Sequence, residues 1–369
     1  MKIALIEPIG GHGGMDYYDY GLAYGLGCND LDVLFYTCDK TYIRCFRSVD
    51  TILMFKKIWD TNIIIKTFQY LKGHFMSFKD AKKKKVRLIH LHFFTFRFID
   101  YLILIIAKKM NFIIIVTVHD INSFNKKANL SIERGCYKLI DGAIVHNNSS
   151  YNDLNKKNIT IKKITIIPHG NYNLFIKKIP LKRSDNVFTL LFFGQIKKVK
   201  GLDILLNSIK LVIDKGYKIK LIIAGKVWKS DLDYYINLIK ELNIQSAVET
   251  NFRYIPDEEI ASFFSKADLV VLPYLEIYQS GVLLLTMSYG RPVLCSDLNA
   301  FKEIIIDKEN GFLFENKNKD SLANSIIDII DNQCIVDKVV KNADRLIESR
   351  YNWLNIGKQT ADLYHSLLD

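Results

Sequence analysis

The sequence of 369 residues lacks a membrane-length hydrophobic run and a cysteine pattern typical of a metal or disulfide framework. Its apolar stretch at 101–107 ends in two lysines and is far shorter than the roughly 18–20 residues that a membrane span needs. The six cysteines lie far apart without a Cys-x-x-Cys pair, which argues against a zinc site and a disulfide scaffold. The start, MKIALIEPIGG, lacks the apolar length and cleavage site of a signal peptide. These absences predict a cytoplasmic protein in which any membrane attachment is peripheral.

Two cofactor signatures are also missing. The glycine loop at 10–14 does not have the GxGxxG spacing, and no acidic residue stands at the usual dinucleotide position, so a nicotinamide cofactor is disfavoured. Asp-x-Asp occurs at 30–32 and 231–233, where it opens a predicted strand and a predicted helix. Turn or cap residues explain both pairs better than a metal-binding loop does.

The positive charge of the chain is confined to its first half. Residues 1–185 carry 29 Lys and Arg against 15 Asp and Glu, whereas residues 186–369 carry 22 against 24. A cationic first half fits an anionic partner such as a phospholipid surface, a lipid-linked phosphate or RNA. Scattered solvated lysines are the alternative for any one cluster, as at 82–85. No nucleic-acid recognition motif accompanies the charge, so we do not expect nucleic acid as a partner.

The length and the pattern of apolar runs predict two α/β domains. A hydrophobic content of 49% over 369 residues suits two cores of roughly 150–200 residues each. Short Ile, Val, Leu and Phe runs alternate with longer helical patterns, which is typical of parallel strands covered on both faces by helices. The predicted strands are 2–7, 32–37, 88–92, 113–118, 142–146 and 165–168, then 189–194, 220–225, 248–252, 269–273, 292–296 and 311–314.

The predicted architecture is two doubly wound Rossmann-like domains in series, facing a central cleft. The segment IPLKRSDN at 179–186 has the proline, charge and turn residues of a linker. We therefore expect domains at 1–182 and 183–351, with a last helix at 352–369 that joins the first domain. Ligands of such sheets bind beyond the carboxyl ends of the strands, so the loops after the strands are where function is expected.

Two such loops stand out in the first half. The glycines of the 10–14 loop let the backbone approach a phosphate or sugar closely, and the helix that begins near Met15 points free N–H groups at an anion. A structural tight turn explains the same glycines. His119 follows the strand IIIV, where it can bond a hydroxyl or phosphate or carry a proton; a satisfied structural histidine is the alternative. His90 and His92 are interpreted as core or cleft wall.

In the second half, the loop from Gly194 to Gly201 carries three lysines and leads into a helix. Such a loop can neutralise a leaving diphosphate, although a solvated basic turn is about as good an explanation. Further along, Ser280 is a good N-cap, and Ser280 and Gly281 leave amide donors at a helix start for phosphate oxygens. Glu276 lies just before them, placed to accept bonds from hydroxyls. A plain helix cap with a surface glutamate is the alternative.

Taken in order, these residues resemble glycosyltransferase family 4, the retaining group 1 glycosyltransferases of GT-B fold. The resemblance covers nearly the whole chain. The matching elements are Gly13-Gly14, TVHD at 117–120, IPHG at 167–170, GQIKKVKG at 194–201, IIAG at 222–225, ADLVVLPY at 267–274, QSGVLLLTMSYGRPVL at 279–294 and NGFLF at 310–314.

The resemblance implies a role for several single residues. The diphosphate-binding lysine of the family falls on Lys200, and its partner arginine is replaced by Gln195, so that Lys197 is the proposed substitute. The histidine of the family that contacts acceptor and sugar falls on His119. Trp353 lies in a segment that resembles the C-terminal helix by which the family crosses back onto its first domain.

The Glu-x7-Glu pair of the family is out of register. Its two positions fall on Ile277 and Leu285, so Glu276 is one residue early and the glutamate that grips the ribose is missing. This resembles the subgroup in which a QSG turn replaces the pair, and Glu303 is a distant candidate for the ribose. The residues implied for catalysis are His119, Lys200 and Glu276. Those implied for donor binding are Gly13, Gly14, Gly194, Lys197, Lys200, Ser280, Gly281 and Glu303.

The resemblance implies transfer of a sugar from a UDP- or GDP-sugar with retention of configuration and without a metal or cofactor. The second domain would bind the nucleotide sugar, and the basic first domain would bind a glycan or lipid-linked acceptor, in bacterial surface polysaccharide synthesis. Peripheral contact of the first domain with an anionic membrane, at the inner face of the plasma membrane, is a further expectation. The missing glutamates leave one alternative open, a catalytically inactive GT-B-like partner or regulatory subunit.

Overall fold

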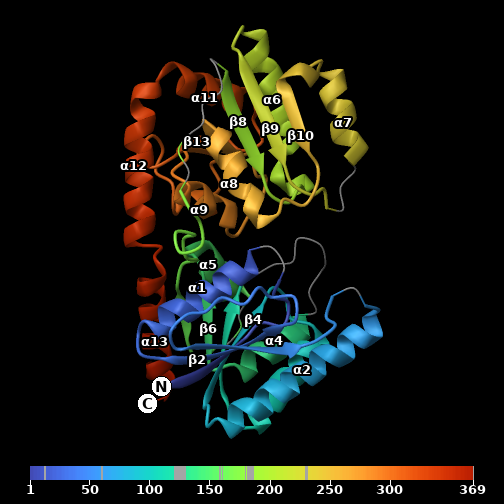
Figure 1. Cartoon of the computed structure of the whole chain (residues 1–369), viewed down its shortest axis with the longest axis vertical. Coiled ribbons are helices and arrows are strands. Elements are labelled where there is room, and N and C mark those ends of the chain that lie inside the picture. The colour runs from blue at the N-terminus through green and yellow to red at the C-terminus, as the bar shows by residue number, and fades with distance from the viewer. Residues whose placement is uncertain are drawn as a thin grey trace. The chain divides into compact units, whose positions relative to one another are not determined.

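A computed structural model describes residues 1–11, 14–59, 61–119, 130–157, 159, 161–178, 180, 187–228 and 232–368. The chain forms two compact units, shown in Figure 1. The first contains Met1–Gly170 and Tyr351–Asp369, and the second contains Asn171–Arg350. Each unit has its own parallel sheet.

The first unit has a seven-stranded sheet in the order β3-β2-β1-β4-β5-β6-β7 within the described residues. Near-continuous apolar strands such as IIIVTV are buried on both faces, as expected of a parallel sheet under helices. The strands are β1 (Lys2–Ile6), β2 (Asp32–Cys38), β3 (Val49–Phe55), β4 (Leu88–Phe93), β5 (Ile113–Val118), β6 (Gly142–Val145) and β7 (Ile164–Ile166). The helices are α1 (Met15–Gly27), α2 (Ile63–Lys83), α3 (Phe98–Lys109), α4 (Leu130–Leu139), α5 (Asn148–Lys156) and α13 (Trp353–Leu368).

The second unit has a six-stranded sheet in the order β10-β9-β8-β11-β12-β13. Helix α6 shows why these elements form, since its leucine, isoleucine and valine side chains recur at helical spacing and are buried. The strands are β8 (Phe188–Phe193), β9 (Ile219–Ala224), β10 (Val248–Asn251), β11 (Leu269–Leu272), β12 (Val293–Ser296) and β13 (Phe312–Phe314). The helices are α6 (Leu202–Asp214), α7 (Leu232–Glu241), α8 (Asp257–Lys266), α9 (Gly281–Ser288), α10 (Asn299–Lys302), α11 (Lys319–Asp331) and α12 (Gln333–Ser349), with 3₁₀ turns η1 (Lys198–Lys200) and η2 (Gln245–Ala247).

The predicted two-domain α/β fold is confirmed, and all twelve predicted strands are present. The prediction missed β3, an edge strand that is only partly buried and contains a charged residue, Asp50. In each sheet the first strand lies in the middle, with the order reversing between β1 and β4 and between β8 and β11. Each reversal is a topological switch point, where open α/β sheets bind ligands beyond the strand ends.

The boundary between the units falls after Gly170, ahead of the predicted division at 182/183. The reason lies in two bonds made inside the second unit. Asn171 Nδ2 donates to the carbonyl of Ile347 at 2.8 Å, and the Tyr172 amide donates to Ser288 Oγ at 3.0 Å. Of the predicted linker at 179–186, all but Pro180 lies outside the described residues.

The last helix belongs to the first unit, as the sequence predicts. In Figure 1, α13 (red) lies beside α1 (blue), although the two are at opposite ends of the chain. Close approach is possible because glycines meet there: a Cβ atom on Gly25 would lie 2.0 Å from the carbonyl oxygen of Trp353. Further along α13, the Tyr364 hydroxyl bonds His90 Nδ1 at 2.6 Å. The C-terminal segment is therefore part of the first core.

Candidate functional site

The switch point of the second sheet brings two loops together. One follows β8 and contains η1, and the other follows β11 and leads into α9. The Leu275 amide donates to the Val199 carbonyl at 2.9 Å and so joins the two loops. The sequence predicted functional residues in both loops, and the strand order explains why they meet, since β8 and β11 are neighbours.

A glycine sets the geometry of the first loop. Gly201 has φ +65, and a Cβ atom there would lie 1.9 Å from the carbonyl oxygen of Pro273. A side chain would therefore be strained in its backbone and would collide with the other loop. Gly201 thus lets α6 begin directly against the end of β11, with Lys200 immediately before it.

Lys200 and Ser280 both interact with the side chain of Tyr274. The ammonium of Lys200 lies 3.5 Å from the centroid of the Tyr274 ring, a cation–π contact. The side chain of Ser280 interacts with the hydroxyl of the same tyrosine and lowers its pKa, an effect smaller than that of burial. Burial raises the pKa of the Tyr274 hydroxyl, so that this group stays neutral. The basic loop and the start of α9 are therefore one site.

The start of α9 offers backbone donors at this site. Ser280 is its N-cap, and Ser280 Oγ accepts the Leu283 amide at 3.2 Å. The first amides of a helix have no intrahelical acceptor, and the helix dipole favours an anion there. Gly281 is closely packed, since a Cβ atom on it would lie 2.7 Å from the Tyr172 hydroxyl. Val282 of the same turn approaches Gly194, with its Cγ2 atom 3.2 Å from the Cβ position of that glycine.

The remaining predicted residues of the second unit lie in the same loops or in the next helix along the chain. Lys197 is half-buried at the N-cap of η1, and Glu276 is exposed in the loop before Ser280. Glu303 is half-buried at the end of α10, two residues after Phe301, whose ring lies 5.5 Å from that of Tyr274. Of the predicted set, Lys200 and Ser280 interact with Tyr274, a residue whose role the sequence analysis missed. Its signal was an aromatic residue at the carboxyl end of a strand.

The other predicted residues belong to the first unit. Gly13 is outside the described residues, and Gly14 is the N-cap of α1. His119 follows β5 and is buried, with its ring stacked on Phe94 at 4.9 Å. Burial is the largest of the effects that hold the pKa of His119 well below its usual value, so the ring is neutral.

His119 belongs to a cluster of buried imidazoles around Tyr18. The Tyr18 ring centroid lies 5.1–5.3 Å from the ring centroids of His92, His119, His146 and His169. Burial also lowers the pKa of His146 to about 3 and that of His169 to about 4. The rings are therefore neutral and form an aromatic core at the carboxyl ends of the strands of the first sheet. This position fits the interpretation of His92 as core or cleft wall.

Two doubly wound domains of this kind define the GT-B class of glycosyltransferase folds. The solved structure of a sucrose-phosphate synthase from Thermosynechococcus elongatus superposes with a TM-score of 0.81 at 21% identity, over 100% of this chain and 99% of that one. HepE from Anabaena, solved in complex with UDP, gives a TM-score of 0.74 at 17% identity, over 99% and 100%. The fold is therefore shared along the full length of both proteins.

Sequence comparison matches two parts of the chain to family models. Residues 174–353 match the model of "Glycosyl transferases group 1", and residues 92–168 match that of the "Glucosyltransferase 3-like, N-terminal domain". An uncharacterized glycosyltransferase of Methanocaldococcus jannaschii is 28% identical over 51% of this chain and 48% of its own length. The capsular polysaccharide biosynthesis glycosyltransferase CapM of Staphylococcus aureus is 22% identical over 56% of each. The chain spans about half the length of these curated relatives, and the match to the group 1 glycosyltransferase model covers residues 174–353.

Proposed function

We propose that the protein is a metal-independent, retaining glycosyltransferase that moves a sugar from a UDP- or GDP-sugar to a glycan or lipid-linked acceptor. One observation carries the proposal: Lys200 and the N-terminus of α9 share Tyr274 at the switch point of the second sheet. A cation and helix amides at one strand edge are the groups that stabilise a departing diphosphate. The group 1 family match and the UDP complex of HepE support the same class of donor.

In this proposal the second unit holds the donor. Lys197, Lys200 and the amides at Gly281 bind the diphosphate, and negative charge that develops on it during transfer is neutralised without a metal. Glu276, which is exposed beside this site, accepts bonds from donor hydroxyls. Glu303 is our candidate for the ribose, because the register of the loop leaves no second glutamate near α9.

The first unit holds the acceptor in this proposal. Gly13-Gly14 at the start of α1 approaches the sugar, and His119 orients the acceptor or the transferred sugar. Because the His119 ring is buried under Phe94, this role requires Phe94 to turn aside. Exchange of Phe94 for alanine should then lower KM for the acceptor, whereas exchange of His119 should lower kcat.

The donor half of the proposal is tested with purified protein and a panel of UDP- and GDP-sugars. Release of nucleoside diphosphate is measured with and without a lipid or glycan acceptor, in chelator-treated buffer, and product configuration is read by NMR. We expect selective turnover and an α-linked product from an α-linked donor. Failure to bind or turn over any nucleotide sugar would reject the proposal and favour the inactive-subunit alternative.

We also propose that the first unit contacts an anionic membrane through α2. Among the described residues, no helix is both long enough and apolar enough to span a bilayer. Helix α2 nevertheless leaves Ile64, Phe68 and Phe75 at least half exposed, and lysines accompany them along the helix. Apolar side chains flanked by lysines are typical of helices that lie in the interface of an anionic bilayer.

Vesicle binding tests this contact. Replacing Phe68 and Phe75 together with serine should weaken binding to vesicles of phosphatidylglycerol and phosphatidylcholine by about 30-fold or more, since each inserted ring contributes about 1–2 kcal/mol. Tyr254→Ser is the matched control, an exposed aromatic side chain in the second unit. Equal binding to pure phosphatidylcholine vesicles would contradict a role for the lysines of α2. No binding to the anionic vesicles would reject the membrane contact.

A further inference from the structure

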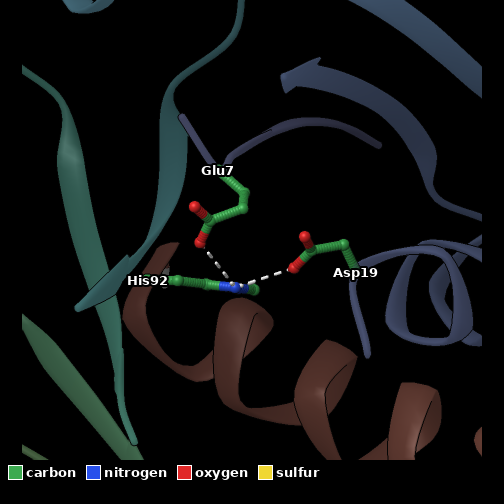
Figure 2. Close-up of side chains that lie close together, drawn as sticks. All are labelled: Glu7, Asp19 and His92. Carbon is green, nitrogen blue, oxygen red and sulfur yellow. Dashed lines mark ion pairs between the residues drawn. The ribbon is translucent and has the colours of Figure 1, made fainter. Parts of the chain in front are cut away.

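Three ionisable side chains converge in the core of the first unit. Glu7 follows β1, Asp19 lies on the buried face of α1, and His92 lies near the end of β4, as Figure 2 shows. They come together because β1 and β4 are neighbours, with Ile6 paired to Leu91. All three are at least nine-tenths buried, at 1%, 0% and 5% exposure.

Their polar atoms are close but poorly satisfied. His92 Nδ1 lies 2.9 Å from Asp19 Oδ1 and 3.8 Å from Glu7 Oε2. Even so, neither oxygen of Asp19 and neither ring nitrogen of His92 has a hydrogen-bond partner among the described residues. The 2.9 Å approach thus has the length of a hydrogen bond without its alignment. Leaving a buried polar atom unpaired costs about 1–3 kcal/mol, so four such atoms in one place point to a missing partner.

We propose that Glu7, Asp19 and His92 bind one divalent first-row cation of the zinc class. One ligand atom from each residue lies within 4.8 Å of the others, and among the described residues this is the one such group of three. Two ligand atoms at about 2.1 Å from a tetrahedral ion are about 3.4 Å apart. This value lies between the 2.9 Å from His92 Nδ1 to Asp19 Oδ1 and the 3.8 Å from His92 Nδ1 to Glu7 Oε2. One imidazole nitrogen with two carboxylate oxygens suits zinc better than it suits magnesium or calcium.

Charge favours the same occupant. Two carboxylates in a core without solvent are costly unless a cation or protons neutralise them. A divalent ion would neutralise both and give the Nδ1 lone pair of His92 an acceptor. It would also tie α1 to the carboxyl ends of β1 and β4, and so hold the start of α1 in place. This ion is structural, and its site is separate from the proposed diphosphate site in the second unit.

The experiment begins with the metal content of the full chain. After dialysis against metal-free buffer, plasma mass spectrometry should find about one zinc-class ion per chain. Chelator-treated protein should gain about 5–10 °C in Tm from Zn²⁺ at 100 times its Kd. Asp19→Asn, which keeps the side-chain volume, should weaken Zn²⁺ binding by about 100-fold or more, because even outer partners of metal ligands typically contribute 10–100-fold.

Asp100→Asn is the matched control, another fully buried carboxylate of the same unit, bonded to Tyr70 and Arg97. It should bind Zn²⁺ like the wild type. X-ray absorption of the Zn²⁺-loaded wild type needs no variant, and it should show nitrogen and oxygen ligands at about 2.0–2.2 Å. A sulfur shell at about 2.3 Å, the same Zn²⁺ affinity in Asp19→Asn, or a wild type without metal and without a Zn²⁺ shift would each overturn the proposal. The last result would mean that protons neutralise the cluster.

Discussion

Replacement of Lys200 by alanine tests the proposed diphosphate site by removing one ammonium group. An ammonium and a phosphate charge about 4 Å apart attract by about 4 kcal/mol at an effective dielectric constant of about 20. Lys200 is half-buried, so salt screens part of this attraction. We therefore expect Lys200→Ala to lose about 2–4 kcal/mol of transition-state stabilisation, which is about 30- to 1000-fold in kcat/KM.

The assay is release of nucleoside diphosphate from the preferred donor at low salt, with Lys198→Ala as control. Lys198 lies on the same 3₁₀ turn and is exposed, so its loss should change kcat/KM less than threefold. Loss of the contact with Tyr274 removes about 1 kcal/mol and should lower Tm by about 2–4 °C, which leaves the variant folded at 25 °C. A folded Lys200→Ala protein with full turnover would refute the assignment.

Three further predictions follow from single residues. Gly201→Ala should lower Tm by more than 5 °C, because φ is +65 and the Pro273 carbonyl lies where the methyl group would be; an unchanged melting curve would contradict this. Tyr274→Phe keeps the ring under Lys200 but removes the hydroxyl that interacts with the Ser280 side chain, so donor Kd, measured by calorimetry, should rise about threefold to tenfold. Burial lowers the pKa of His74 to about 4, so the stability that its neutral ring contributes is present above about pH 6.5 and is lost as the pH falls toward 4. The urea midpoint should therefore fall more from pH 7 to pH 5 in the wild type than in His74→Phe.

The strands of both sheets were predictable because parallel strands buried on both faces are short, nearly continuous apolar runs. IIIVTV at β5 and LVVL at β11 are examples. The prediction failed at β3, where an edge strand mixes Asp50 and Thr51 with apolar residues and so loses that signature. It also failed at the domain boundary, because the bonds of Asn171 and Tyr172 join residues far apart in the sequence.

Candidate site residues could be proposed where a loop follows a strand. Lys200 and Ser280 lie in the loops after β8 and β11, and the rule that ligands bind beyond strand ends directed attention to both loops, whereas the family resemblance singled out Lys200. Tyr274 was missed because its function depends on what lies on its two sides, a basic loop and a helix start. That arrangement becomes visible only once β8 and β11 are known to be neighbours.

The cluster of Glu7, Asp19 and His92 could not be predicted. No spacing rule links the three positions, and the sequence analysis interpreted His92 only as core or cleft wall. The strand order brings the ends of β1 and β4 together, and α1 returns Asp19 over them. His119 differs from the sequence prediction in another way. Its position directly after β5 suggested an accessible side chain, but the ring of Phe94 stacks on it.

A crystal structure of the protein with a bound nucleoside diphosphate tests the central claim most directly. We predict that oxygens of one diphosphate lie within about 3 Å of both Lys200 Nζ and the Gly281 amide nitrogen, at the switch point between β8 and β11. A diphosphate bound elsewhere, with neither group in contact, would contradict the account.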